Sequence, residues 1–202
     1  GVAGFGRTGL DGFRFALRGN RHRQTLSSLR PELATSPVRL NTRSLGFALG
    51  PRMNAAGRLE TARIALDMLV ATDDAVALEK AQQLDDLNRA RRTDQDSIMK
   101  QALVQAEIYK DDPVLVVSGI GWNHGIVGIV AAKLLEKYAK PTFVLEEMGD
   151  EAKGSARSYG DFSAADAIRA SDDIITKGGG HKLAAGVTMP AANIAAFRQR
   201  VN

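Results

Sequence analysis

The chain has 202 residues, 44% of them hydrophobic and 25% charged, which is the composition of a globular protein and not of a disordered one. Its apolar runs are far shorter than the roughly 20 residues that a membrane-spanning helix needs. It contains no cysteine, which excludes disulfide scaffolds, thiolate metal sites and cysteine nucleophiles. We therefore expect a cytoplasmic protein that does not associate with membranes. The chain begins with Gly1 and carries no targeting signal, so we expect a fragment of a longer protein.

Positive charge is concentrated near the N-terminus. Residues 1–63 hold eleven arginines and three carboxylates, a net charge of +8, whereas the remaining 139 residues sum to −4. Because guanidinium groups make bidentate contacts with phosphate, this distribution is compatible with binding to a polyanion. It is equally compatible with a surface that packs against an acidic neighbour.

The first half of the chain is predicted to be helical after a glycine-rich start. Residues 1–45 predict a short helix or two and much loop, and residues 61–70 predict a helix. A cap at residues 72–74 then begins a helical pattern that extends to about Tyr109. A helix of about 36 residues would be about 54 Å long, and its polar middle predicts an interdomain strut that crosses solvent. The alternative is a helical hairpin broken near Thr93.

After Pro113 short β-branched runs alternate with helical segments. This alternation predicts a small α/β domain with a mixed sheet, preceded by the long helix and by a mostly helical and loop-rich segment. The expected strands are residues 114–118, 142–147, 153–158 and 186–189, and the expected helices are residues 125–138, 163–170 and a last one from 191.

Two segments of this domain pair a strand with groups that bind anions. Residues 119–130 run from a strand into a helix N-terminus, where free N–H groups and the helix dipole favour phosphate. The alternative is an ordinary turn in which Trp122 fills the core and His124 caps the helix. In residues 153–158, strand alternation would send Ser155 and Arg157 to one face, where a hydroxyl and a guanidinium can share a phosphate. A solvated edge strand is the alternative.

A third segment, residues 177–186, contains three consecutive glycines followed by His181 and Lys182. Consecutive glycines are unfavourable in conformational entropy unless the backbone needs φ > 0 or close approach. We therefore predict a backbone nest for an anion, with these two side chains at its rim. A flexible loop is the alternative.

The sequence shows no complete metal site. His22, His124 and His181 are scattered, and adjacent acidic pairs such as residues 85–86 diverge on a helix or a strand. It also lacks a phosphate-binding P-loop and a nucleophile elbow.

Taken in order, five segments resemble the C-terminal part of the catalytic core of RecJ-type single-stranded-DNA exonucleases, which belong to the DHH phosphoesterase superfamily. The resemblance covers about residues 40–200. The segments are GFALGPRMNAAGRLE (46–60), LDDLNRARR (84–92), GWNHGIVGIVAAKL (121–134), KGSARS (153–158) and KGGGHKLAAG (177–186).

The resemblance implies an enzyme with two lobes. The N-terminal lobe would bind two Mn²⁺ or Mg²⁺ ions, which we expect to be held by residues outside this chain. Residues 1–60 would be the end of that lobe, residues 61–110 a helical connector with the strut, and residues 111–202 the DHH-associated substrate-binding domain.

The resemblance also assigns roles to individual residues. Ser155 and Arg157 would hold a 5′-terminal phosphate, and Gly179, Gly180 and His181 would line the reacting phosphodiester. The expected catalytic residue is His181, and the expected substrate-binding residues are Arg52, Asn54, Arg58, His124, Lys153, Ser155, Arg157, Gly179, Gly180 and Lys182. Of these, Arg52, Asn54 and Arg58 would face the cleft between the lobes.

The implied activity is 5′→3′ removal of mononucleotides from single-stranded DNA by metal-dependent hydrolysis, in DNA repair and recombination. The fragment alone would be inactive. Expected partners are single-stranded DNA with a 5′-phosphate and a single-strand-binding protein or helicase, with the chain itself a monomer. Two alternatives remain: an oligoribonuclease or small-nucleotide phosphatase of the same superfamily, and a nucleic-acid-binding module without catalysis.

Overall fold

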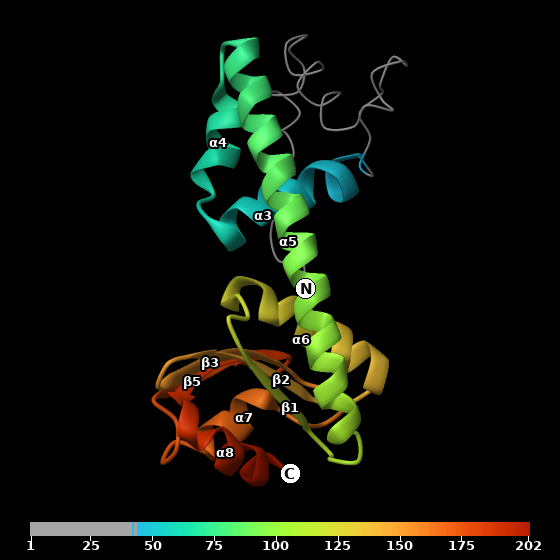
Figure 1. The fold of residues 1–202 in the computed structure, drawn as a ribbon, viewed down its shortest axis with the longest axis vertical. Coiled ribbons are helices and arrows are strands. Elements are labelled where there is room, and N and C mark those ends of the chain that lie inside the picture. Colours follow the sequence, from blue (N-terminus) through green and yellow to red (C-terminus); the bar gives the residue numbers. More distant parts are fainter. Residues whose placement is uncertain (1–41, 43) are drawn as a thin grey trace. The chain divides into compact units, whose positions relative to one another are not determined.

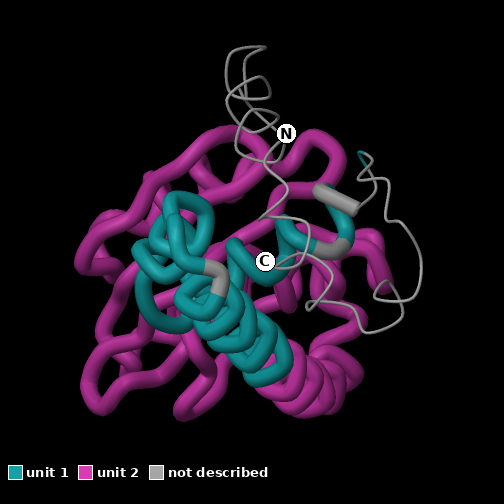
Figure 2. The backbone as a smooth tube through the Cα atoms, turned by 90° about the horizontal axis from the view of Figure 1, so that it is seen from above, with its two compact units in different colours: residues 1–91 teal, residues 92–202 magenta. Residues whose placement is uncertain are grey.

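The computed structural model describes residue 42 and residues 44–202. The chain divides after Arg91 into two compact units, coloured separately in Figure 2. The predictions of short helices and loops for residues 1–41 and 43 lie outside the described residues. Within the part of the chain that is described, no helix is long and apolar enough to cross a membrane.

The described part of unit 1 is helical. It contains a π-helix (η2, Ser44–Leu49), α3 (Gly50–Leu59), α4 (Arg63–Val70) and the start of α5 (Asp74–Ile108). Pro51 lies in the first turn of α3, where its missing N–H would have no partner in any case. The core of this unit consists of small and flexible apolar residues: Leu49, Ala56, Ala65, Met68, Ala81 and Leu84.

Helix α5 is continuous over 35 residues and runs through the division between the units (Figure 1). This confirms the single long helix, and the alternative of a hairpin broken near Thr93 is wrong. Asp73 caps its N-terminus, because its carboxylate accepts hydrogen bonds from the N–H groups of Ala75 and Val76. Most of residues 89–97 are exposed, as the polar sequence of this stretch predicts.

Unit 2 is built on a five-stranded sheet in the order β1-β2-β3-β5-β4. The strands are β1 (Leu115–Ile120), β2 (Thr142–Met148), β3 (Glu151–Arg157), β4 (Lys177–His181) and β5 (Ala184–Pro190). Strands β1 and β2 are parallel and joined through helix α6 (His124–Tyr138), whereas the other neighbours pair antiparallel. The sheet is therefore mixed, as predicted.

The two faces of the sheet have different coverings (Figure 1). On one face, α7 (Ala164–Arg169), a short 3₁₀ helix (Ala191–Asn193) and α8 (Ile194–Val201) close the main core. Phe143 of β2 packs edge-on against Phe197 of α8, with ring centroids 5.1 Å apart. On the other face, α6 packs over β2 and β3 and leaves β5 and β4 without a helix above them.

The C-terminal part of α5 packs within unit 2. Trp122 is buried, and its indole N–H donates to the Gln101 side chain over 3.1 Å, so it fills the core as the turn alternative predicts. A Cβ at Gly119 would lie 2.2 Å from this indole, which explains the glycine. The same helix, α5, holds Glu107, and partial burial together with a 2.6 Å hydrogen bond to Glu107 raises the pKa of Tyr138 to about 12.

Side chains cap the open edge of β1. The Asn202 amide pairs with both backbone groups of Val114, and the Gln105 amide does the same with Ser118. Between them, the Arg198 guanidinium donates to the carbonyl of Val116. Because unpaired edges invite strand addition by other chains, these caps protect the sheet from that side.

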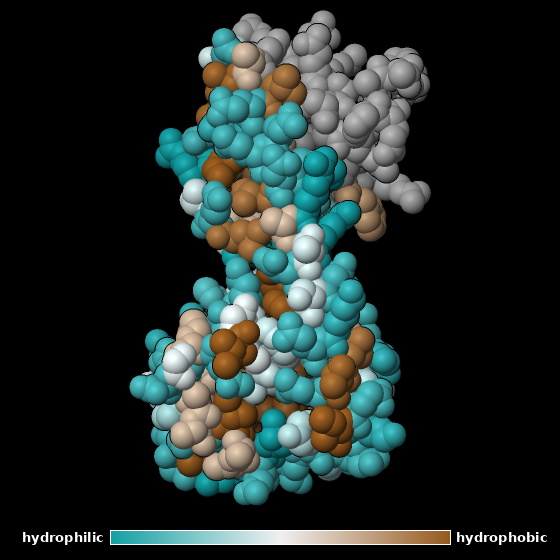
Figure 3. Space-filling view, viewed as in Figure 1, coloured by the Kyte–Doolittle hydropathy of each residue, from teal (hydrophilic) through white to brown (hydrophobic). Residues whose placement is uncertain are grey.

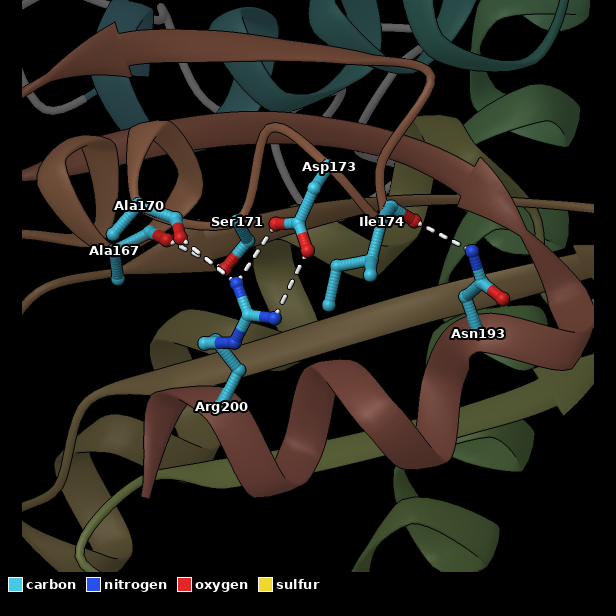
Figure 4. A network of polar contacts seen from close by, with 7 residues as sticks. All are labelled: Ala167, Ala170, Ser171, Asp173, Ile174, Asn193 and Arg200. Carbon is cyan, nitrogen blue, oxygen red and sulfur yellow. Dashed lines mark hydrogen bonds and ion pairs between the residues drawn. The ribbon is translucent and has the colours of Figure 1, made fainter.

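The segment after α7 is fixed to α8 by a polar network (Figure 4). Arg200 donates to both carboxylate oxygens of Asp173, at 2.8 and 3.0 Å, and to the carbonyl of Ala170. The Asn193 amide donates to the carbonyl of Ile174. Hydrogen bonding to Arg200 lowers the pKa of the Asp173 carboxyl.

The coloured part of the face shown in Figure 3 is mostly hydrophilic, with separate apolar patches. Among the described residues of unit 2, Val104, Ile108 and Ile120 are exposed large apolar side chains. Apolar residues of this kind are common on protein surfaces and do not by themselves mark a site.

We expect Asp173→Asn to destabilise unit 2 at neutral pH in a pH-dependent way. Because the folded-state pKa of Asp173 is lowered, the stability that it contributes is fully present above its usual value of 3.8 and is lost as the pH falls through the lowered pKa. Thermal unfolding from pH 7 to pH 2 should therefore show wild type and variant converging in strong acid. A difference that persists there would show that the carboxylate charge is not the cause.

Gly154→Ala should destabilise unit 2 by about 1–3 kcal/mol. The new Cβ would lie 2.4 Å from both the Val144 carbonyl oxygen and a methyl of Leu145, so the backbone must shift. The matched control is Gly186→Ala on the paired strand, where the only atom near a Cβ is the Gly154 oxygen at 3.7 Å. Urea denaturation should show the control unchanged or slightly more stable. Equal destabilisation of both variants would contradict the steric explanation.

Candidate functional site

Three rows of residues cross the α6 side of the sheet from β3 through β5 to β4. Alternation along each strand sends these residues to the face opposite the main core. The strand register gives three rows: Lys153, Thr188 and Lys177; Ser155, Gly186 and Gly179; and Arg157, Ala184 and His181. We call these nine residues the polar face.

Ser155 and Arg157 lie side by side on this face, as strand alternation predicts. The Arg157 Nη1 donates to the Ser155 hydroxyl at 3.2 Å and to the Ala156 carbonyl at 2.8 Å. Both side chains are only partly buried. A hydroxyl and an oriented guanidinium in this arrangement can bind one phosphate group together.

Gly128 of α6 lets the helix approach this pair. A Cβ at Gly128 would lie 3.0 Å from the Arg157 Nη2 and 3.1 Å from the Ser155 hydroxyl oxygen. A larger residue would therefore displace one of the two groups. The close packing of α6 on β3 at this site therefore depends on Gly128.

The middle row has almost no side chains beyond Ser155. A Cβ at Gly179 would meet no atom within 4 Å, and one at Gly186 would meet only the Gly154 oxygen at 3.7 Å. Neither glycine is needed to avoid a steric clash on this face, although the φ of Gly179, +158°, is one that residues with a side chain rarely adopt. Their effect is to leave the backbone of the sheet open to a ligand.

The prediction of a backbone nest over residues 177–186 is wrong. The three glycines lie in the edge strand β4, which pairs antiparallel with β5 through a turn after His181. Two of them are glycine for steric reasons: a Cβ at Gly178 would lie 2.5 Å from the Ile168 side chain, and one at Gly180 would lie 2.4 Å from the Ala184 carbonyl oxygen. The third, Gly179, belongs to the open middle row.

The N-terminus of α6 carries a carboxylate from the protein itself. The backbone N–H of His124 donates to Glu146 at 2.9 Å, and that of Gly125 donates to the cap residue Asn123. The helix cap is therefore Asn123 and not His124. Since Glu146 already occupies this helix end, the geometry does not support the predicted phosphate position on these N–H groups.

His181 and Lys182 lie at the end of β4 and in the following turn, and both are exposed. The turn is fixed to the end of β3, because Ser158 bonds to the carbonyls of Lys182 and Leu183. His181 therefore stands two strands from Arg157, about 10 Å away at the usual strand spacing. Its catalytic role and the binding role of Lys182 stay predictions.

The predicted residues of unit 1 all lie on α3, and they differ in their surroundings. The Arg52 side chain is 14% exposed, and its Nε lies 2.8 Å from Asp85 of α5. Asp85 also pairs with Arg89, the i,i+4 neighbour on its own helix. Asn54 and Arg58 are exposed. Arg52 thus contributes to the packing of unit 1, and the predicted contact of these three residues with substrate stays a prediction.

The described residues do not fit the two metal ions that the resemblance implies. Residue 42 and residues 44–202 contain no group of three or more His, Asp or Glu side chains that could hold a metal ion. We therefore assign no metal ligand to them.

Sequence reasoning gave no individual binding role to Gly128, Lys177, Gly186 or Thr188, although the first three lie in segments that it singled out. Gly186 and Thr188 could have been predicted, because residues 186–189 were expected to form a strand and alternation puts both residues on one face. Lys177 and Gly128 depend on contacts between elements far apart in the sequence. Local patterns carry no signal for such contacts.

Comparison with known proteins finds a domain match and similar exonucleases. Residues 111–202 match the model of the DHHA1 domain. The chain is 39% identical over 166 residues to the single-stranded-DNA-specific exonuclease RecJ of Bacillus subtilis, covering 80% of this chain and 21% of that protein. It is 31% identical over 194 residues to RecJ of Salmonella typhimurium, covering 91% of this chain and 34% of that protein.

Solved structures agree with these matches. A crystal structure of exonuclease RecJ bound to manganese has a TM-score of 0.78 and 31% identity, covering 90% of this chain and 44% of the other. RecJ of Thermus thermophilus in complex with Mg²⁺ has a TM-score of 0.78 and 30% identity, covering 94% and 29%. The chain spans about a fifth to a third of the length of the two curated relatives. Residues 111–202 thus match the DHHA1 domain, and most of the chain is similar to one part of RecJ-type single-stranded-DNA-specific exonucleases.

Proposed function

We propose that this chain is the strand-binding part of a 5′→3′ single-stranded-DNA exonuclease that releases mononucleotides. The observation that carries the proposal is the pairing of Ser155 with Arg157 beside the open glycine row. This arrangement offers a phosphate site with room for a strand above the sheet backbone. The RecJ relatives support single-stranded DNA as the substrate.

Within this proposal, Ser155 and Arg157 anchor the 5′-terminal phosphate. A fixed end places the next phosphodiester at a constant distance, so each cleavage removes one nucleotide. Positioning of this kind supplies much of the rate enhancement in phosphoryl transfer. Exposed His181, two strands away, lies where the reacting phosphodiester would pass and would neutralise charge on it.

Metal ions belong to the other part of the proposed enzyme. Two of the similar structures hold Mn²⁺ and Mg²⁺, and the corresponding ions here would be bound by residues beyond those described. Residues 1–60, 61–110 and 111–202 would then act as the end of the metal-binding lobe, the connector and the substrate-binding domain. We expect this chain alone to be inactive, and the intact monomeric enzyme to work with a single-strand-binding protein or a helicase.

Recognition would involve the backbone of the strand more than its bases. Aromatic residues make up 5% of the chain, so few platforms for base stacking are available. The polar face instead carries hydroxyl, guanidinium, ammonium and imidazole groups, which bind phosphate. The proposed enzyme would therefore show little sequence preference.

In the intact enzyme, Arg157→Ala should lower kcat/KM for a 5′-phosphorylated strand by about 10- to 100-fold, because charge-assisted hydrogen bonds contribute about 1.5–3 kcal/mol. The same strand with a 5′-hydroxyl should be affected far less. Arg169→Ala is the matched control, since Arg169 is an exposed arginine of the same domain that pairs with Asp166 on α7. Single-turnover assays on both strands make the comparison.

An equal loss of activity on both strands would remove the end-binding role of Arg157. A preference for substrates of two to five nucleotides over longer strands would favour an oligoribonuclease or nucleotide phosphatase of the same superfamily.

A further inference from the structure

We propose that Lys153, Lys177 and Thr188 form a second phosphate-binding position, which takes an internal phosphodiester of the same strand. This inference rests on the proposed function and extends it from the strand end to the path of the strand. It assigns a role to Lys177, the first residue of the segment KGGGHKLAAG, and to Thr188, which lies just after that segment; the end-binding site uses neither residue.

The three residues lie in one row of the polar face. Thr188 of β5 is the direct register partner of Lys153 on β3 and of Lys177 on β4. They line a shallow pocket of about 320 Å³ whose floor includes Gly186. Directly opposed residues in an antiparallel pair have Cβ atoms about 5 Å apart, so both ammonium groups can reach an anion above Thr188.

Thr188 is the strongest sign that a ligand belongs there. The residue is 4% exposed and lines the pocket, yet its hydroxyl forms no hydrogen bond with any residue in the range 44–202. No fully buried side-chain nitrogen or oxygen among the described residues lacks a partner, so the Thr188 hydroxyl keeps some accessible surface, and the residue lines this pocket. The carbonyl of Thr188 is already used by the Thr176 N–H. The hydroxyl is left as a donor for a phosphate oxygen, the kind of partner that a largely buried polar group normally has.

The two lysines are also uncommitted. Both side chains are exposed, and neither forms an ion pair or hydrogen bond with a described residue. Two acidic residues share this face with Lys153: Glu146, its direct register partner on β2, and Glu151, two residues along β3. Glu146 accepts the His124 N–H and is 12% exposed. Two cations and one donor thus surround the pocket, a combination that suits a phosphodiester.

The position of this pocket fits a single continuous strand. Lys153 and Arg157 lie four residues apart on the same face of β3, about 13 Å along the strand. The open row of Gly186 and Gly179 separates the two polar rows. A DNA backbone that leaves the Ser155 and Arg157 pair can cross this floor and place a later phosphate over Thr188.

The test uses the 202-residue chain and 3′-fluorescein-labelled oligothymidylates of two and ten nucleotides, each with a 5′-phosphate or a 5′-hydroxyl. Fluorescence anisotropy across a salt series gives the affinity and its salt dependence. The variants are Lys153→Gln/Lys177→Gln and Thr188→Val. The control is Lys133→Gln, which removes one exposed charge from α6 outside the polar face. Thermal unfolding checks that each variant is folded.

The double variant should reduce the slope of log K against log salt by about 0.7, the value for one phosphate contact on a single strand. The loss of affinity should be the same for both 5′ ends and should be absent with the dinucleotide. Thr188→Val should weaken binding of the ten-nucleotide strand with little change in slope. Lys133→Gln should leave both quantities nearly unchanged.

The proposed second phosphate position is wrong if the salt slope of the double variant is unchanged, or if it changes no more than that of the Lys133→Gln control. Binding of inorganic phosphate tests whether the pocket takes a free phosphate and not a phosphodiester of the strand. If the double variant loses phosphate binding but keeps the salt slope of strand binding, the pocket takes a free phosphate and the inference is wrong. A wild-type chain that binds neither strand would contradict the proposed function itself, and the subsite with it.

Discussion

The register of the antiparallel strands β3, β5 and β4 is the constraint on which both the core and the candidate site depend. It turns Ala156 and Val187 toward α7 and α8, and it turns Lys153 and Arg157 to the opposite face. A slip of one residue would exchange the faces and bury charged side chains in the main core. The apolar packing that stabilises unit 2 therefore also fixes the polar face.

Glycine serves two different purposes around this face. At Gly128, Gly178 and Gly180 a side chain would strike a neighbour, so these glycines permit close packing of α6, α7 and β5. At Gly179 and Gly186 a side chain would meet open space or ordinary contact only. The first set brings the elements together, and the second keeps the resulting surface free of side chains. A site for an extended polyanion needs both properties.

The sequence predicted those elements and side-chain positions that depend on local patterns. It did not predict those that depend on residues far apart in the chain. Helical periodicity and the Asp73 cap predicted α5, and alternation placed Ser155 beside Arg157, because these patterns repeat within a few residues. Strand β4 was missed because three glycines carry no side-chain pattern, and their causes lie on α7 and β5. Likewise, Asp85 and Arg89 have the i,i+4 spacing of a local helix pair, but the bond of Asp85 to Arg52 joins residues 33 positions apart.

Net charge is a poor guide to phosphate binding in this domain, and the arrangement of ion pairs explains why. Residues 111–202 hold ten lysines and arginines and eleven carboxylates, so the DHHA1 domain has almost no net charge. Away from the polar face, Arg169 and Arg200 are paired with Asp166 and Asp173. Lys153 and Lys177 of the polar face form no ion pair with a described residue. If the proposed phosphate positions are correct, a nearly neutral domain can bind a polyanion, because binding depends on where the cations lie and less on their sum.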